Sequence, residues 1–193
     1  AYDDGYTAGG MYYCNGTGGE TRRNVTINNV IAGDKIVVYM ASSNAATGTL
    51  VFKYLGEDNE QVEKASFTNK GTKYEFVAKY SGSYKVYTDA AAGKPIYNRI
   101  VRIPGVAVSG TIDGAQLSGY KVMFKDEANG ITYDADIKGN TFTATLAAGC
   151  NYTAVLSGVA GYGFSNATKN ISTTVDEALT GKSGVTLSIE EKK

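Results

Sequence analysis

Short segments of alternating apolar and polar residues recur roughly every ten residues along the chain, and glycine, asparagine or aspartate separates them. Alternation with a period of two places successive side chains on opposite faces of an extended strand, whereas a helix needs a period near 3.6 residues. The 24 glycines, 15 tyrosines and only 2 prolines fit many short strands joined by tight turns. The sequence therefore predicts an all-β fold.

Pro104 and Gly105 divide these segments into two groups, since proline cannot donate to a strand ladder and glycine is permissive. We expect two β-sandwich domains in tandem: residues 1–104, jelly-roll-like, and residues 105–193, immunoglobulin-like or transthyretin-like. The strands expected in the first are Asn24–Asn29, Lys35–Ala41, Thr49–Tyr54, Gln61–Phe67, Lys73–Ala78, Ser83–Thr88 and Ile96–Ile103. Those expected in the second are Val106–Ile112, Tyr120–Lys125, Ile131–Ile137, Thr141–Leu146, Tyr152–Leu156, Asn170–Thr174 and Val185–Ile189, with hairpin turns at Asn129-Gly130 and Gly139-Asn140.

The charge balance and the absence of histidine exclude several functions. Lysine plus arginine and aspartate plus glutamate number 19 each, so no overall field draws the chain to nucleic acid or an anionic membrane surface. The lack of any histidine removes the usual activated nucleophiles and the commonest zinc ligand. A glycosidase needs only two carboxylates. The candidate carboxylates lie in ordinary turns and strands, so we expect no enzymatic activity. These candidates are Asp3, Asp4, Glu20, Asp34 and Glu75.

Neither a metal site nor a disulfide framework is expected. Cys14 and Cys150 lie far apart, and we predict two free thiols. Asp3-Asp4 and the pair Asp134 and Asp136 offer oxygens to calcium, but neither provides the six or more ligands that calcium takes, so we expect no cofactor. No run of 18 apolar residues is present, and we expect no membrane insertion and a monomeric chain.

Tyr12 and Tyr13, followed closely by Arg22 and Arg23, form the first candidate binding site. Aromatic rings pack on the C–H face of a sugar, and guanidinium groups bind hydroxyls or the carboxylate of a uronic acid. The alternative is that one of the two tyrosines belongs to the core, because neighbouring strand residues point to opposite faces.

The segment from residue 89 to residue 99 gives the second candidate site, with Lys94, Tyr97 and Arg99. Strict alternation would place Tyr97, Arg99 and Val101 on one face of a strand, and a bulge or an amphipathic edge is needed to reconcile the pattern. The alternative is equally open: arginine and tyrosine stems often lie along a sheet without binding anything.

Both halves resemble known modules. The segments Asn24–Ile27, Ala32–Met40, Lys73–Phe76, Gly82–Tyr87 and Ile96–Ile103 resemble the accessory β-sandwich domains found beside pectate lyases, pectin esterases and other secreted bacterial carbohydrate-active enzymes. The segments Val108–Ile112, Tyr133–Asp136, Leu146–Ala154 and Val185–Ile189 look like a carboxypeptidase-regulatory or collagen-adhesin B-type repeat, a spacer whose Lys to Asn crosslink we do not expect here because the last strand offers no asparagine.

These resemblances imply a non-catalytic carbohydrate-binding module of an extracellular bacterial polysaccharide-degrading enzyme. The expected partners are a plant cell-wall polysaccharide, with pectin favoured, and a covalently linked catalytic domain in the parent chain. The alternatives are a structural spacer or adhesin stalk with no glycan binding, and a small polysaccharide-cleaving enzyme.

Overall fold

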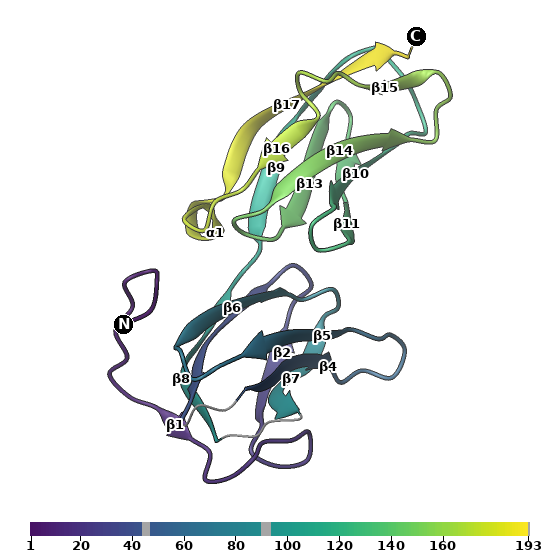
Figure 1. Cartoon of the computed structure of the whole chain (residues 1–193). Helices are drawn as coiled ribbons and strands as arrows, with labels where there is room; N and C mark the ends of the chain where they lie inside the picture. The colour runs from purple at the N-terminus through teal and green to yellow at the C-terminus, as the bar shows by residue number, and fades with distance from the viewer. Residues whose placement is uncertain (44–46, 90–93, 193) are drawn as a thin grey trace. The chain divides into compact units, whose positions relative to one another are not determined.

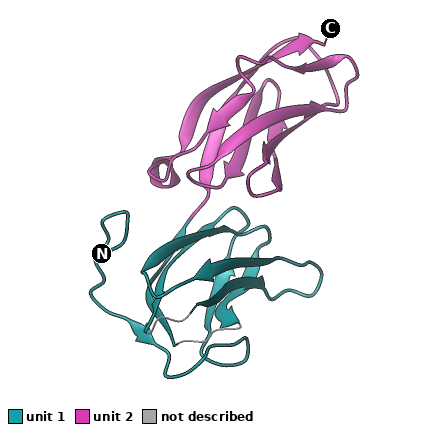
Figure 2. Ribbon diagram, in the orientation of Figure 1, with its two compact units in different colours: residues 1–103 teal, residues 104–193 magenta. Residues whose placement is uncertain are grey.

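The chain forms two separate units, each built almost entirely of β-strands (Figure 1). The computed structural model describes residues 1–43, 47–89 and 94–192. Unit 1 comprises Ala1–Ile103 and unit 2 comprises Pro104–Lys193, so the division lies one residue from the expected boundary (Figure 2). Within the described ranges the only helix is α1 (Glu177–Thr180), and none is long and apolar enough to cross a membrane.

Unit 1 contains two four-stranded antiparallel sheets. The first has, in spatial order, β1 (Tyr12–Tyr13), β8 (Pro95–Ile103), β3 (Lys35–Ser42) and β6 (Thr72–Val77). The second has β2 (Val25–Val30), β7 (Gly82–Asp89), β4 (Gly48–Tyr54) and β5 (Val62–Phe67). Side chains of both sheets share one core, in which the Phe52 ring of β4 stacks on Phe76 of β6 at 4.9 Å and on Tyr84 of β7 at 4.5 Å.

Strand β3 is buried on both of its faces, which explains its unbroken apolar sequence. Ile36, Val38 and Met40 point into the core between the sheets. Val37 and Tyr39 point outward and are covered by Tyr2 and Tyr6 of the N-terminal segment. The segment before β1 is therefore part of the folded unit.

A β-bulge interrupts β8 where the sequence pattern required one. Arg99 is paired with Tyr39, but Tyr97 is paired with the next residue, Met40, so Asn98 is the extra residue. The bulge turns Tyr97 toward the core while Arg99 and Val101 stay on the outer face. Strict alternation would have kept Tyr97 and Arg99 on the same face, and the structure separates them.

Unit 2 also contains two sheets. The first has β11 (Ile131–Asp134), β10 (Lys121–Asp126), β14 (Asn151–Ser157) and β16 (Asn170–Ser172). The second has β12 (Asp136–Lys138), β13 (Thr141–Leu146), β9 (Val106–Gly114), β17 (Lys182–Glu191) and β15 (Tyr162–Phe164). The rings of Phe124 and Phe142, one from each sheet, lie 5.6 Å apart in the core, and β17 pairs with β9 in parallel.

The main differences from the sequence prediction concern very short elements. β1, β15 and α1 were not expected, and the single strand predicted at Ile131–Ile137 is two strands that pair in different sheets. The chain changes sheet at Ala135, whose N–H donates to the Val122 carbonyl. Both predicted hairpin turns are present, with Gly130 and Gly139 at positive φ.

Gly110 provides a test of the parallel β9–β17 contact. It lies opposite Val185, and a Cβ at this position would overlap the Val185 carbonyl oxygen. We expect Gly110→Ala to lower the free energy of unfolding of unit 2 by about 2 kcal/mol or more, because backbone cannot move aside as a flexible side chain can. The adjacent Ser109→Ala is the control, and urea unfolding is the measurement; equal midpoints for the two variants would contradict the close packing.

Candidate functional site

Tyr12 and Tyr13 are both exposed at the edge of the first sheet of unit 1. Their side chains are 52% and 44% exposed, and the preceding Met11 is 64% exposed. Strand β1 pairs with β8 alone, with Tyr12 opposite Tyr97 and Tyr13 opposite Ile96. Neither ring is in the core, and both are accessible at the sheet edge. We name Met11, Tyr12, Tyr13 and Lys94 the edge surface.

Lys94 lies beside the Tyr13 ring of the edge surface. Its Nζ is 5.7 Å from the centroid of the Tyr13 ring and donates a hydrogen bond to Asn15 Oδ1 at 3.1 Å. The ammonium group is therefore held next to an exposed ring by a neutral partner, and its charge is not cancelled there. Residues 90–93 of the second candidate segment lie outside the described residues.

Tyr97 supports the edge surface from below and is not itself accessible. Its side chain is 3% exposed, and its ring stacks on Tyr12 at 6.2 Å. Burial raises the pKa of its hydroxyl, which has no hydrogen-bond partner among the described residues. The expectation that Tyr97 contacts a ligand directly does not fit this position, because the bulge at Asn98 turns the ring inward.

Arg99 lies on the outer face of the same sheet, with its guanidinium group against two neighbouring tyrosine rings. Its guanidinium carbon is 5.1 Å from the Tyr6 ring and 5.7 Å from the Tyr39 ring. The Tyr6 and Tyr39 rings are themselves 4.7 Å apart. Within residues 1–43, 47–89 and 94–192, Arg99 forms no ion pair, so a positioned, exposed cation remains. We name Tyr2, Tyr6, Tyr39 and Arg99 the arginine cluster.

Asn98 joins the arginine cluster to the N-terminal segment. Its Oδ1 accepts a hydrogen bond from the Tyr2 hydroxyl at 2.6 Å, and its Nδ2 donates to the Gly10 carbonyl at 3.0 Å. The bulged residue thus holds the chain on its path from the arginine cluster to β1 and the edge surface.

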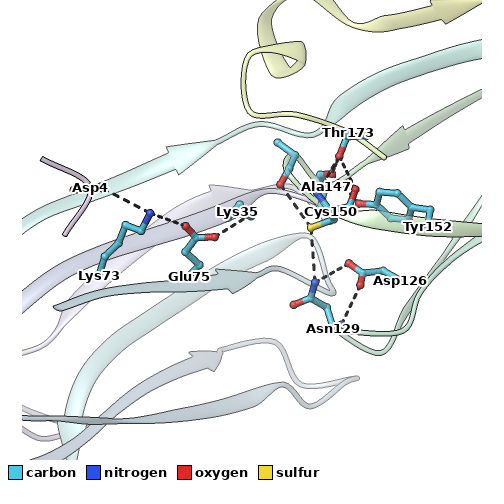
Figure 3. Close-up of polar contacts among 11 residues, drawn as sticks. Asp4, Lys35, Lys73, Glu75, Asp126, Asn129, Ala147, Cys150, Tyr152 and Thr173 are labelled. Carbon is cyan, nitrogen blue, oxygen red and sulfur yellow. Dashed lines mark hydrogen bonds and ion pairs between the residues drawn. The ribbon is translucent and has the colours of Figure 1, made fainter. Parts of the chain in front are cut away.

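The carboxylates of Asp4 and Glu75 already have partners, and Figure 3 shows their ion pairs with Lys73 and Lys35. Asp4 accepts a hydrogen bond from the Tyr39 hydroxyl at 2.7 Å, and the Lys73 ammonium lies 3.6 Å from the same carboxylate oxygen. Glu75 pairs with Lys35 at 3.1 Å and with Lys73 at 3.2 Å. These pairings explain why neither acid neutralises Arg99.

The same contacts lower the pKa of both carboxyl groups. The hydrogen bond from Tyr39 is the largest cause for Asp4, followed by the Tyr6 backbone N–H and the charge of Lys73. Desolvation is the largest influence on Glu75 and raises its pKa, but the hydrogen bonds and charges of Lys35 and Lys73 together outweigh it. Glu20 also has a lowered pKa, chiefly through its hydrogen bond with Lys53. A general acid of a glycosidase needs the opposite, a raised pKa.

Arg22 and Arg23 do not lie at the edge surface. Arg23 donates to the Thr17 carbonyl at 3.2 Å and lies against Gly16, so it fixes the loop that contains Gly16, Gly18 and Gly19. Arg22 is exposed in a turn closed by its N–H bond to the Gly19 carbonyl. Among the described residues, the cations that face a tyrosine ring are Lys94 and Arg99.

A polar cluster at one end of unit 2 contains Cys150 (Figure 3). The buried Asp126 carboxylate accepts hydrogen bonds from the backbone N–H and side-chain amide of Asn129, and that amide faces Cys150 Sγ at 3.8 Å. The hydroxyl groups of Tyr152 and Thr173 both donate to the Ala147 carbonyl, at 2.7 and 2.6 Å. These bonds hold the turn before β14. Within the described residues, neither Cys14 nor Cys150 is part of a disulfide.

Metal-ligating groups do not gather in the part of the chain that the structure describes: no cluster of three or more acids or cysteines that could hold an ion occurs there. Comparisons with protein-family models, with curated proteins and with solved structures found no match. The assignment of a function therefore depends on the geometry of the chain itself.

Sequence reasoning missed Tyr6 and Tyr39 as the partners of Arg99. A signal was present: Tyr39 stands within the apolar run of β3 at a position whose parity is opposite to that of the core residues Val38 and Met40. A tyrosine on the outer face of a central strand requires a cover, and the tyrosine-containing N-terminal segment supplies it here, beside Val101 and Ile103 of β8.

Removal of the Lys73 charge tests this network. In Lys73→Met the pKa values of both Asp4 and Glu75 should rise toward their ordinary values, because each loses a cation while Tyr39 and Lys35 remain. NMR titration of the carboxyl carbons measures both. Lys70→Met, which removes only an exposed pair with Asp3, is the control and should leave the two values unchanged; the same result for Lys73→Met would contradict the network.

Proposed function

We propose that unit 1 is a non-catalytic carbohydrate-binding domain for an acidic plant cell-wall polysaccharide, pectin in the first place. The observation that carries this proposal is the pairing of tyrosine rings with cations that, within the described residues, have no acidic partner. Lys94 lies over the exposed Tyr13, and the exposed Arg99 lies against the part-buried Tyr6 and the buried Tyr39. Unit 1 would act as a targeting module of an extracellular bacterial polysaccharide-degrading enzyme.

The chemistry of a polyuronide fits these groups. A pyranose ring has a C–H face that packs on an aromatic ring, and each uronate carries one carboxylate that a guanidinium or ammonium group binds by charge-assisted hydrogen bonds. Because the Arg99 guanidinium is already positioned against two tyrosine rings, it loses little conformational entropy when it binds such a carboxylate. A protein surface without charged groups would not favour an acidic polysaccharide over a neutral one.

The two cations suit a polymer better than a single sugar. Lys94 directly precedes β8 and Arg99 lies five positions further on, which at roughly 3.3 Å per residue separates them by at most about 17 Å. Each exposed ion pair contributes only about 1 kcal/mol or less. Useful affinity therefore needs a polysaccharide that contacts both cations and the tyrosines of the edge surface together.

The finer fold description also belongs to this proposal. The two four-stranded sheets of unit 1 around one core support a jelly-roll-like carbohydrate-binding domain, and the two sheets of unit 2 support an immunoglobulin-like or transthyretin-like spacer. In an adhesin-type repeat, Lys121 would be the lysine of the Lys to Asn crosslink; its side chain is exposed, which disfavours a crosslink.

A structural spacer without glycan binding is the second candidate. The observation in its favour is that the chain divides into two compact units, as in a series of stalk modules. The binding experiment separates the two candidates directly.

Affinity electrophoresis against pectin, xylan, glucan and mannan provides the test. We expect retardation by pectin alone, weakening as salt rises from about 0.05 to 0.5 M because the Debye length shrinks. Arg99→Ala should weaken binding about fivefold, and Tyr12→Ala with Tyr13→Ala should weaken it about tenfold or more. Lys138→Ala, an exposed lysine of unit 2, controls for net charge.

Equal mobility of the native chain in all four gels would refute glycan binding and leave the spacer. Release of reducing sugar from the same polymers by the purified chain would refute the non-catalytic assignment. An equal effect of Lys138→Ala and Arg99→Ala would mean that net charge, and not the arginine cluster, determines the retardation.

A further inference from the structure

An open groove lies on the outer face of a sheet in unit 2, over β10, β14 and β16. Its volume is about 500 Å³, within the range of small-molecule sites. Six of the residues that line it carry polar side chains: Lys125, Glu127, Asn151, Thr153, Asn170 and Ser172. The function proposed for unit 1 makes no use of this groove.

The strand register arranges these side chains as a grid. Lys125 lies opposite Thr153, and Thr153 lies opposite Asn170, which makes one row across three strands. Asn151 lies opposite Ser172 in a second row, two residues along each strand. Neighbouring strands are about 4.8 Å apart and the rows about 7 Å apart, so the grid has the dimensions of a short oligosaccharide.

Alternation explains why the grid faces outward. Phe124, Tyr152 and Ala154 are buried in the core of unit 2, so their neighbours Lys125, Asn151 and Thr153 point to the opposite face. The exposed Ala128 leaves an apolar group at the groove for the C–H face of a sugar ring, whereas Ile171, opposite the buried Tyr152, points to the other face of the sheet.

The polar side chains of the groove retain most of their hydrogen-bonding capacity. Thr153 Oγ1 donates to Asn170 Oδ1 at 3.3 Å, which fixes the amide and leaves its Nδ2 as a donor. Within the described ranges, the side chains of Asn151, Ser172, Lys125 and Glu127 form no hydrogen bond or ion pair. Amides and hydroxyls that both donate and accept match the hydroxyl groups of a sugar.

The charges distinguish this groove from the surface of unit 1. Lys125 and Glu127 supply one cation and one anion, and the other four polar groups are neutral. An anionic polymer gains nothing from such a balance, whereas a neutral ligand is not penalised. We infer that this groove binds a neutral oligosaccharide of about two or three sugar rings, the length that a cavity of this size holds.

NMR of the full ¹⁵N-labelled chain tests the inference, because the side-chain amide signals of Asn151 and Asn170 report directly on the groove. Xylohexaose, cellohexaose and mannohexaose are the probes. At least one should shift both signals in a saturable manner, with a Kd on the order of 0.1–1 mM, as expected for a small, exposed site. No shift with any probe up to about 10 mM, tenfold above that range, would overturn the inference.

Variants test the location of the site. Asn151→Ala with Asn170→Ala should weaken binding of the responding probe at least about tenfold, since two hydrogen-bonding groups are lost. Asn166→Ala, an exposed asparagine of unit 2 outside the groove, is the matched control and should bind as the native chain does. Thr153→Val, which keeps the strand shape, should also weaken binding; native affinity in this variant and in the double variant would overturn the assignment.

The same titrations separate this site from the one proposed in unit 1. A chain with Tyr12→Ala and Tyr13→Ala should retain full affinity for the neutral probe. Oligogalacturonate should leave the Asn151 and Asn170 signals unmoved, and a shift equal to that of the neutral probe would refute the neutral specificity of the groove.

Discussion

The burial of β3 on both faces is the constraint from which the outer surface of unit 1 follows. One face of Ile36–Met40 packs against the opposing sheet, and the other leaves Val37 and Tyr39 to be covered. The cover is the N-terminal segment, whose Tyr2 and Tyr6 rings pack on Tyr39 at 5.1 and 4.7 Å. Removal of apolar area from water stabilises this arrangement by about 25 cal/mol per Å², and the same packing creates the tyrosine pair that holds Arg99.

The bulge at Asn98 divides β8 into two parts whose side chains pack differently. Before the bulge, Tyr97 fills the core beneath Tyr12; after it, Arg99 and Val101 belong to the outer face. Without the extra residue, Tyr97 and Arg99 would lie on the same face of β8. With it, β8 supports Tyr12 of the edge surface and presents the Arg99 cation on the outer face. The hydrogen bonds of Asn98 to Tyr2 and Gly10 link these two regions.

The sequence predicted what depends on local patterns and missed what depends on distant partners. Alternation and turn residues were sufficient for most strands and for both hairpins, because each strand of four to nine residues contains its own signal. β1 has two residues and exists only because β8 offers an edge, so no local pattern marks it. In the site, the exposure of Tyr12 and Tyr13 follows from that same edge, whereas the Arg99 environment required knowledge that residues 6, 39 and 99 meet.

The two proposed sites differ in charge, and this difference bears on how weak sites would act together. In unit 1 the acids Asp4 and Glu75 are already paired with Lys73. The groove of unit 2 balances Lys125 with Glu127. Plant cell walls contain acidic and neutral glycans in the same matrix, so a chain with one site for each would gain from effective concentration even if each site alone binds weakly. Two sites for the same acidic polymer would instead need a strand long enough to reach both, whereas complementary sites require only that the two polymers be neighbours.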